Sequence, residues 1–219
     1  MEETVLVVVA HPDDQIFGPG GAIAKYAKEG KSVRTIIASY GEKSHPHFKQ
    51  EVIRDIRVKE SERADRLIGG KGIEYWGVRE GKFASDFESM NLRERLIDVL
   101  ETYKPVKIFT HARNETHPDH VAINSFVLSC YDEVAKNHEW FNPPVYTFTV
   151  WNYFRIKKRD VPRLIVDVSD TFRVKLAALS LFKSQIITMI NLKWSVYLKA
   201  FVTGFRNNTS FAEEFYKVR

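Results

Sequence analysis

The sequence predicts an α/β protein, with a mostly parallel β-sheet covered by helices on both faces. Over the first 136 residues, apolar and β-branched runs suited to strands alternate with longer amphipathic segments suited to helices. The first run, VLVVVA from Val5 to Ala10, is apolar throughout, as expected of a strand buried on both faces. His11, Asp13 and Asp14 follow it at once. Because ligands of parallel sheets bind at the carboxyl ends of strands, we expect the functional site at this edge.

Strands and helices are predicted in alternation, with glycines and polar turns between them. The first helix begins at Gly20 or Gly21 and stops before Gly30, and Asn91 is the expected N-cap of a later helix. Polar segments over Ser39–Lys49 and Gly77–Ser89 are expected to be loops that wall the site. The predicted strands are Val5–Ala10, Val33–Ala38, Ile73–Trp76 and Lys107–Thr110, and the predicted helices are Gly20–Lys28, Gln50–Ile68, Asn91–Tyr103 and Pro118–Lys136.

The remainder of the chain has a weaker pattern. Val145–Val150 and Leu164–Val168 are predicted to be strands, followed by a long helix from Thr171 to Ile190. The tail from Asn191 to Arg219 mixes aromatic and basic residues, which suits core packing, a subunit contact or a helix lying on a membrane surface. No segment has the composition of a linker, so residues 1–219 are expected to form a single domain.

The composition excludes several classes of protein. The formal net charge of +5 is only mildly basic, and the one basic cluster, Arg155–Arg159, is short, so no nucleic-acid partner is expected. Cys130 is the single cysteine, which rules out an internal disulfide and suits a reducing compartment. No signal peptide and no apolar run of about 18 residues is present. The sequence therefore predicts a cytoplasmic protein, with peripheral membrane contact as a minor alternative.

Two polar clusters carry the chemistry, and each follows an apolar strand. His11, Asp14 and His120 supply two imidazoles and one carboxylate and leave a position for water, which is the ligand set of a catalytic zinc site. Such a site generates a hydroxide-like nucleophile at neutral pH. Asp13 is then free to act as a general base, and His117 to stabilise an oxyanion and protonate a leaving amine. This combination favours hydrolysis of an amide or ester.

The other histidines are weaker candidates. His111 directly follows the strand Lys107–Thr110, and it suits either a role behind the metal ligands or a purely structural one. His45, His47 and His138 are expected to be solvated loop residues.

AHPDD at residues 10–14 and HPDH at residues 117–120 resemble the PIG-L/LmbE family of zinc-dependent N-deacetylases. The paired motifs are specific at this separation. The family includes enzymes that act on N-acetylglucosaminyl-phosphatidylinositol, on mycothiol and bacillithiol precursors and on diacetylchitobiose. The resemblance implies a Rossmann-like, LmbE-like fold. Weaker similarities extend over most of the chain, at RVKE (57–60), KSQ (183–185) and FAEEF near the carboxyl end.

The resemblance also implies a role for individual residues. His11, Asp14 and His120 would bind one Zn²⁺ per chain, although other divalent ions suit the same donors. Asp13 would be the base and His117 the acid and electrophilic group, with Asp119 orienting His117 or a metal ligand. The resemblance places two residues at the sugar, Arg57 and the acid Glu80, with Asp86 as the alternative acid.

Gln15 departs from the family pattern, which has a glutamate there. The change removes one negative charge near the site and leaves the ligands and the base in place.

The sequence thus predicts an enzyme that removes the acetyl group from an N-acetylglucosamine-type sugar or glycoconjugate. An amidase acting on a larger thiol-sugar conjugate remains an alternative with the same metal site. A nucleotide-binding module is a weaker one, because the GPGG turn of residues 18–21 lacks the dinucleotide-binding glycine spacing. Family members often form homo-oligomers, and nothing in this sequence identifies an interface.

Overall fold

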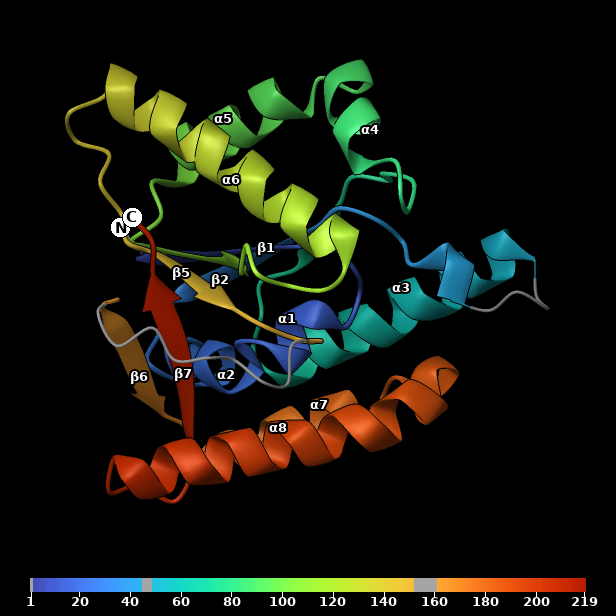
Figure 1. Ribbon diagram of the computed structural model, residues 1–219, viewed down its shortest axis with the longest axis vertical. Helices are drawn as coiled ribbons and strands as arrows, with labels where there is room; N and C mark the ends of the chain where they lie inside the picture. Colours follow the sequence, from blue (N-terminus) through green and yellow to red (C-terminus); the bar gives the residue numbers. More distant parts are fainter. Residues whose placement is uncertain (1, 45–48, 152–160) are drawn as a thin grey trace.

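The computed structural model describes residues 2–44, 49–151 and 161–219, and of residues 186–191 only the backbone (Figure 1). In this part of the chain, seven strands form one sheet in the order β3-β2-β1-β4-β5-β7-β6. The predicted α/β class is confirmed. The strands are β1 (Thr4–Val9), β2 (Ser32–Ile37), β3 (Ile73–Tyr75), β4 (Lys107–His111), β5 (Val145–Phe148), β6 (Arg163–Asp167) and β7 (Ala212–Lys217).

The sheet is mostly parallel, as predicted. β1 lies between β2 and β4 and is parallel to both, and β3 and β5 extend the parallel part on either side. β7 lies antiparallel between β5 and β6. Strand alternation directs Val5, Val7 and Val9 to one face of the sheet and Leu6 and Val8 to the other. Both faces of β1 are therefore buried.

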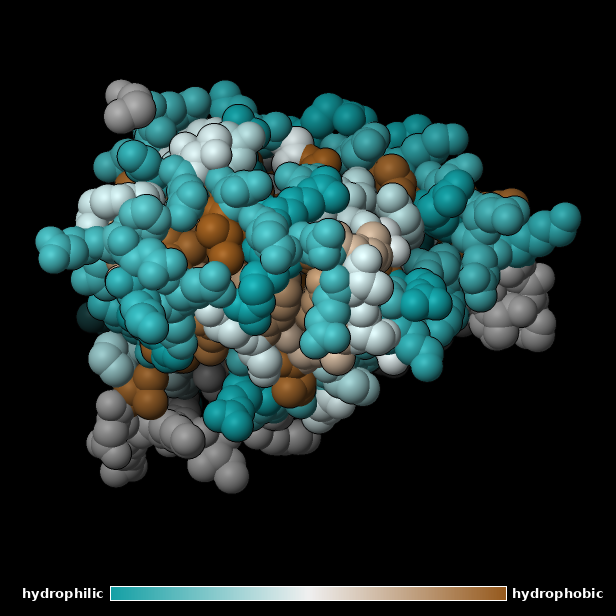
Figure 2. All heavy atoms as spheres, turned by 90° about the horizontal axis from the view of Figure 1, so that it is seen from above, coloured by the Kyte–Doolittle hydropathy of each residue, from teal (hydrophilic) through white to brown (hydrophobic). Residues whose placement is uncertain are grey.

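Helices cover both faces, as Figure 1 shows. α4, α5 and α6 pack on the face that Leu6 and Val8 share, and the other helices pack on the opposite face. On the outside of the α4–α6 layer, Figure 2 shows a mostly hydrophilic surface with small separate apolar patches. The α-helices are α1 (Asp14–Phe17), α2 (Gly20–Lys28), α3 (Gln50–Leu67), α4 (Phe83–Ser89), α5 (Leu92–Tyr103), α6 (Pro118–Asn137), α7 (Phe172–Leu179) and α8 (Ile186–Arg206).

The predicted loop over Gly77–Ser89 is partly wrong, because its second half forms α4. Phe83 and Phe87 lie four residues apart and bury their rings together, and the Phe87 ring stacks on Phe126 of α6 at 4.0 Å. Asn91 is not the predicted side-chain cap. It has a left-handed backbone (φ 50°), its side chain makes no capping bond, and it links α4 to α5.

The predicted helix from Thr171 to Ile190 is also wrong, because the chain breaks after α7 and turns through a short 3₁₀ helix, η2 (Lys183–Gln185). Glu60 of α3 explains the turn: its carboxylate accepts bonds from the backbone N–H of Ser184 at 2.9 Å and from its hydroxyl at 2.6 Å. The chain then continues as α8, whose buried Leu192 and Ala200 face the core. β7 was not predicted.

Within the described residues, no helix combines the length and the apolar character needed to cross a membrane. His45, His47 and the basic cluster Arg155–Arg159 lie outside the described residues.

Candidate active site

The two polar clusters meet because β1 and β4 are adjacent and parallel, with Val8 opposite Thr110. Their carboxyl ends therefore deliver His11 and His111 to the same edge of the sheet. The backbone N–H of Ala10 donates to His111 Nε2 at 3.3 Å and joins the two strand ends. The second motif follows β4 through a short loop and opens α6.

Three donor atoms converge at this edge. His11 Nδ1 lies 3.2 Å from His120 Nε2, and each of these nitrogens lies 3.3 Å from Asp14 Oδ2. All three side chains are buried. The backbone N–H of His11 also donates to Asp14 Oδ2 at 2.8 Å, which holds the carboxylate beside the first imidazole.

These separations fit a tetrahedral zinc site. Zinc–ligand bonds of about 2.0–2.1 Å make the edge of a tetrahedron about 3.3–3.4 Å, close to the donor separations of this triad. Two imidazoles and one carboxylate leave one position open, which is typical of catalytic rather than structural sites. The residues present therefore suit zinc, and other divalent ions accept the same donors.

Carboxylates stand behind both imidazoles of the triad. His11 Nε2 lies 3.4 Å from Asp119 Oδ2 and 3.6 Å from Glu80 Oε1, and His120 Nδ1 lies 3.5 Å from Glu115 Oε1. Metal-bound histidines commonly direct their second nitrogen at a carboxylate, which fixes the ring and its tautomer. Asp119 thus faces the ligand His11, one of the two alternatives that the sequence left open.

Sequence reasoning assigned no role to Glu115. Its carboxylate accepts bonds from the backbone N–H groups of Val150 and of Trp151, the latter at 3.3 Å, so the segment after β5 holds it against His120. Nothing local in the sequence signals this contact, because Val150 lies 35 residues further along the chain. Glu115 is a buried carboxylate aimed at a ligand.

His111 belongs to the site but not to the triad. Its ring stacks on His120 with centroids 3.8 Å apart and an interplanar angle of 21°. Burial and the charge of His120 lower the pKa of His111 to about 4, so the ring is neutral at physiological pH. The stacked ring of His111 therefore restricts the position of the His120 ring. His138, in contrast, pairs with Glu101 at 2.8 Å, remote from the site.

The electrostatics of the triad favour a cation. Burial lowers the pKa of His11 and His120, but the surrounding carboxylates outweigh it, so the pKa of His11 rises to about 10 and that of His120 to about 9. Burial opposes ionisation of Asp14 as well, yet the imidazoles hold its pKa well below the usual value. The carboxylates around the two imidazoles thus favour positive charge at this point, carried either by protons on the imidazoles or by a bound cation.

Asp13 and Arg57 form a pair beside the triad. Arg57 Nη2 lies 3.2 Å from Asp13 Oδ2, and Arg57 Nη1 donates to the carbonyl of Gly41 at 3.2 Å. Burial raises the pKa of Asp13, and the guanidinium opposes that shift. The structure therefore places Arg57 at the site, where its guanidinium contacts the predicted base.

His117 is the N-cap of α6. Its Nδ1 accepts the backbone N–H of Asp119 at 3.2 Å, so the neutral ring carries its proton on Nε2. Burial, together with the charges of His11 and His120, lowers the pKa of His117. The resting side chain is thus a neutral hydrogen-bond donor.

The two predicted wall loops lie against the site. Gly81 donates its N–H to both oxygens of Asp119 at 3.1 and 3.2 Å, and Lys43 donates its N–H to Glu80 at 2.6 Å. Asp86, the alternative sugar-binding acid, is instead engaged by Arg79, whose Nε donates to it at 2.9 Å.

Gln15 and the GPGG turn of residues 18–21 both have structural partners. Gln15 is buried and donates to the hydroxyl of Ser61 on α3 at 2.9 Å. The N–H groups of Gly21 and Ala22, at the start of α2, donate to the Glu213 carboxylate at 3.0 and 2.8 Å. A carboxylate of the chain itself therefore occupies the helix terminus at which a nucleotide phosphate would bind, which argues against the nucleotide-binding alternative.

Residues 6–131 match the sequence profile of the family described as GlcNAc-PI de-N-acetylase, or PIG-L. The chain belongs to the PIG-L family. The segment matched contains both polar clusters, and the predicted resemblance is confirmed.

Other proteins resemble most of the chain in sequence, and solved structures resemble it in fold. A probable N-acetyl-α-D-glucosaminyl L-malate deacetylase 2 of Bacillus cereus is 26% identical over 201 residues, covering 87% of each chain. A 4-oxalmesaconate hydratase of Pseudomonas putida is 24% identical over 197 residues, covering 84% of this chain and 74% of its own. The structure of an N,N'-diacetylchitobiose deacetylase from Pyrococcus horikoshii superposes with a TM-score of 0.79 at 22% identity, covering 99% of this chain and 84% of that one. This likeness confirms the predicted fold.

Proposed function

We propose that this PIG-L family protein is a zinc-dependent deacetylase that removes the N-acetyl group of an N-acetylglucosamine-type sugar or glycoconjugate. The observation that carries the proposal is the convergence of His11 Nδ1, Asp14 Oδ2 and His120 Nε2 at 3.2–3.3 Å, the spacing of a tetrahedral site with one open position. The relative in Bacillus cereus bears the name of such a deacetylase. We also infer that residues 1–219 act as a single domain, since both cores share one sheet.

His11, Asp14 and His120 would hold the ion, which when bound supplies an activated water at neutral pH. Asp13 would accept the proton of that water. Burial raises its pKa, which makes it a stronger base than an ordinary aspartate, and Arg57 fixes its orientation.

His117 would donate from Nε2 to the carbonyl oxygen of the acetyl group as negative charge develops there. Its bond from the Asp119 N–H keeps Nδ1 occupied and directs the Nε2 proton outward as a donor. The proton taken up by Asp13 would then pass to the amine nitrogen as the C–N bond breaks, releasing acetate and a free amine. Glu80 and Arg57 remain our candidates for contact with the sugar.

The test is amine and acetate release from a panel of N-acetylated sugars, including N-acetylglucosamine, its malate conjugate and diacetylchitobiose. We expect activity that a chelator abolishes and added zinc restores. Asp13→Asn should lower kcat by about 100-fold or more while the zinc content of the folded protein stays unchanged. Asp55→Asn, on the exposed face of α3, is the matched control and should retain full activity. A folded, zinc-loaded protein that is inactive across the panel would count against deacetylation.

Two other reactions suit the same donors. A larger thiol-sugar amide would use the same residues, and only its inclusion in the panel separates it from the leading proposal. The second reaction is the addition of water to a conjugated carboxylate, because one of the relatives is named as a hydratase. If the protein lowers the ultraviolet absorbance of such a compound and releases no amine from the panel, its reaction is hydration and the deacetylase proposal is wrong.

A further inference from the structure

α8 presents an apolar face that nothing in the described part of the chain covers. Its inner face packs on the core through the buried Leu192 and Ala200. On the outside, Trp194 is 73% exposed, Leu198 61% and Phe205 76%. Five large side chains at helical spacing fall within an arc of about 100°. This outer face of α8 consists of Trp194, Tyr197, Leu198, Phe201 and Phe205.

The exposed area of the outer face is large for a surface feature. A fully exposed side chain of this kind has about 200 Å² of surface. Scaled by the exposed fractions of the five residues, the outer face exposes about 600 Å², the upper end for an apolar patch on a monomer. The surface over α4, α5 and α6, in contrast, is mostly hydrophilic (Figure 2). In Figure 1, α8 runs along the side of the molecule opposite those helices. The outer face of α8 thus lies on the side of the molecule away from that hydrophilic surface.

All the charged side chains of α8 are positive. Lys193, Lys199 and Arg206 are the charged residues of α8, and the segment 186–206 contains no aspartate or glutamate. Lys193 flanks one side of the apolar arc, where its ammonium donates to Ser180 Oγ at 3.0 Å, and the other two cations flank the opposite side. A helix with aromatic residues on one face and cations at its borders is typical of peripheral membrane contact.

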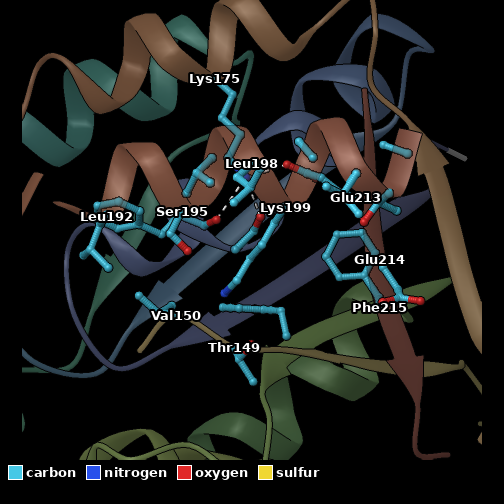
Figure 3. Close-up of a pocket in the computed structure, with 18 of the residues that line it drawn as sticks. Thr149, Val150, Lys175, Leu192, Ser195, Leu198, Lys199, Glu213, Glu214 and Phe215 are labelled. Atoms are coloured by element: carbon cyan, nitrogen blue, oxygen red, sulfur yellow. Dashed lines mark hydrogen bonds and ion pairs between the residues drawn. The ribbon is translucent and has the colours of Figure 1, made fainter. Parts of the chain in front are cut away.

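A cavity of about 350 Å³ adjoins the outer face, between α8 and the strands β5 and β7 (Figure 3). Leu192, Val196 and Phe215 are among its apolar walls, and Leu198 belongs both to the cavity and to the outer face. Lys199 and Arg206 lie in the same lining, together with Glu213 and Glu214. The apolar surface therefore continues from the outer face into the cavity, whose charged groups include both signs.

We propose that the outer face of α8 docks this protein on the surface of a membrane rich in anionic lipids. The helix would lie in the plane of the interface, with Trp194 and Phe205 entering the acyl boundary and the flanking cations contacting lipid headgroups. A second copy of the chain is the other natural occupant. Two antiparallel copies of α8 would bring six cations together with no acid from either helix, and this repulsion opposes pairing.

The test is co-sedimentation of the full-length, zinc-loaded protein with vesicles. We expect it to bind vesicles of equal parts phosphatidylglycerol and phosphatidylcholine at least about tenfold more tightly than pure phosphatidylcholine, and high salt to weaken that binding. Trp194→Gln/Phe205→Gln should abolish binding. Trp140→Gln, which changes an exposed tryptophan that stacks with Lys104 elsewhere on the surface, should not.

Three results would overturn the proposal. The first is equal binding of the native protein to anionic and neutral vesicles, a result that does not depend on any variant. The second is full vesicle binding by the double variant. The third is a dimer in light scattering that the double variant dissociates, with no vesicle binding, since this would assign the face to a second copy. The deacetylase activity on soluble substrates is read separately, so neither proposal depends on the other.

Discussion

The ammonium group of Lys175 lies 2.6 Å from Glu213 Oε1, in a buried ion pair that joins α7 to β7. Lys175 also donates to the carbonyls of Phe17 and Gly18 at 2.9 and 2.8 Å, which ends α1, while the Glu213 carboxylate caps the start of α2. The pair therefore holds the end of α1 and the start of α2, the two helices next to the first polar cluster.

Lys175→Met should destabilise the protein by about 3–5 kcal/mol, because it leaves the Glu213 carboxylate buried without its counter-charge. Urea unfolding followed by circular dichroism measures the loss. The double variant Lys175→Met/Glu213→Gln removes the unpaired charge as well. Its loss of unfolding free energy should be smaller than the sum of the losses of the two single variants. Additive losses would show that the two residues do not act as a unit.

Glu115→Gln should weaken zinc binding by about 10- to 100-fold, because the neutral amide no longer polarises the imidazole of His120. The amide oxygen still accepts the backbone bonds from Val150 and Trp151, so the melting temperature of the metal-free protein should change little. Competition with a chromophoric chelator gives the affinity. Glu101→Gln alters a similar carboxylate–histidine pair far from the site and is the control. Equal zinc affinities of Glu115→Gln and the native protein would exclude a role for Glu115 behind the ligand.

Asp65 should make stability depend on pH. Burial raises the pKa of this carboxyl group to about 6, against a smaller opposing effect of its bond from the Gly72 N–H at 3.1 Å. The folded state therefore binds the Asp65 proton more tightly than the unfolded state, and this contribution to stability is lost as the pH rises from about 4 through 6.

Asp65→Asn removes that titration. At pH 8 we expect the variant to be more stable than the native protein by about 2 kcal/mol, and near pH 3.5 we expect the difference to vanish. Urea unfolding at a series of pH values measures this difference. Asp55→Asn, exposed on the same helix, should show no such trend. A difference independent of pH would contradict the raised pKa.

Gly18 is required by close packing at the end of α1. A Cβ at this position would lie 2.3 Å from ring atoms of Phe148, and the Phe148 ring also contacts His111 at a centroid distance of 5.0 Å. Gly18→Ala should therefore push the ring towards the site and cost about 1–3 kcal/mol. Phe148→Leu in the same chain should recover part of that cost by making room. Unchanged unfolding of Gly18→Ala would show that the ring moves freely.

The alternation of strand and helix patterns determined the sheet, because apolar runs report which faces are buried. The polar residues that follow β1 directly, and β4 through a short loop, predicted the triad of His11, Asp14 and His120, since adjacent parallel strands end at the same edge. These properties are local, or depend on one strand pairing.

Only the tertiary structure decided the surroundings of the triad. Glu115 faces His120 because the segment after β5 holds its carboxylate, and Glu213 caps α2 from 192 residues further along the chain. β7 enters the sheet antiparallel, beside β5, with no local signal that the sequence analysis recognised. Hydrophobic periodicity records burial along one segment, whereas these contacts depend on how distant segments pack. The sequence therefore determined the fold class and the donors, and tertiary packing decided which charges surround them.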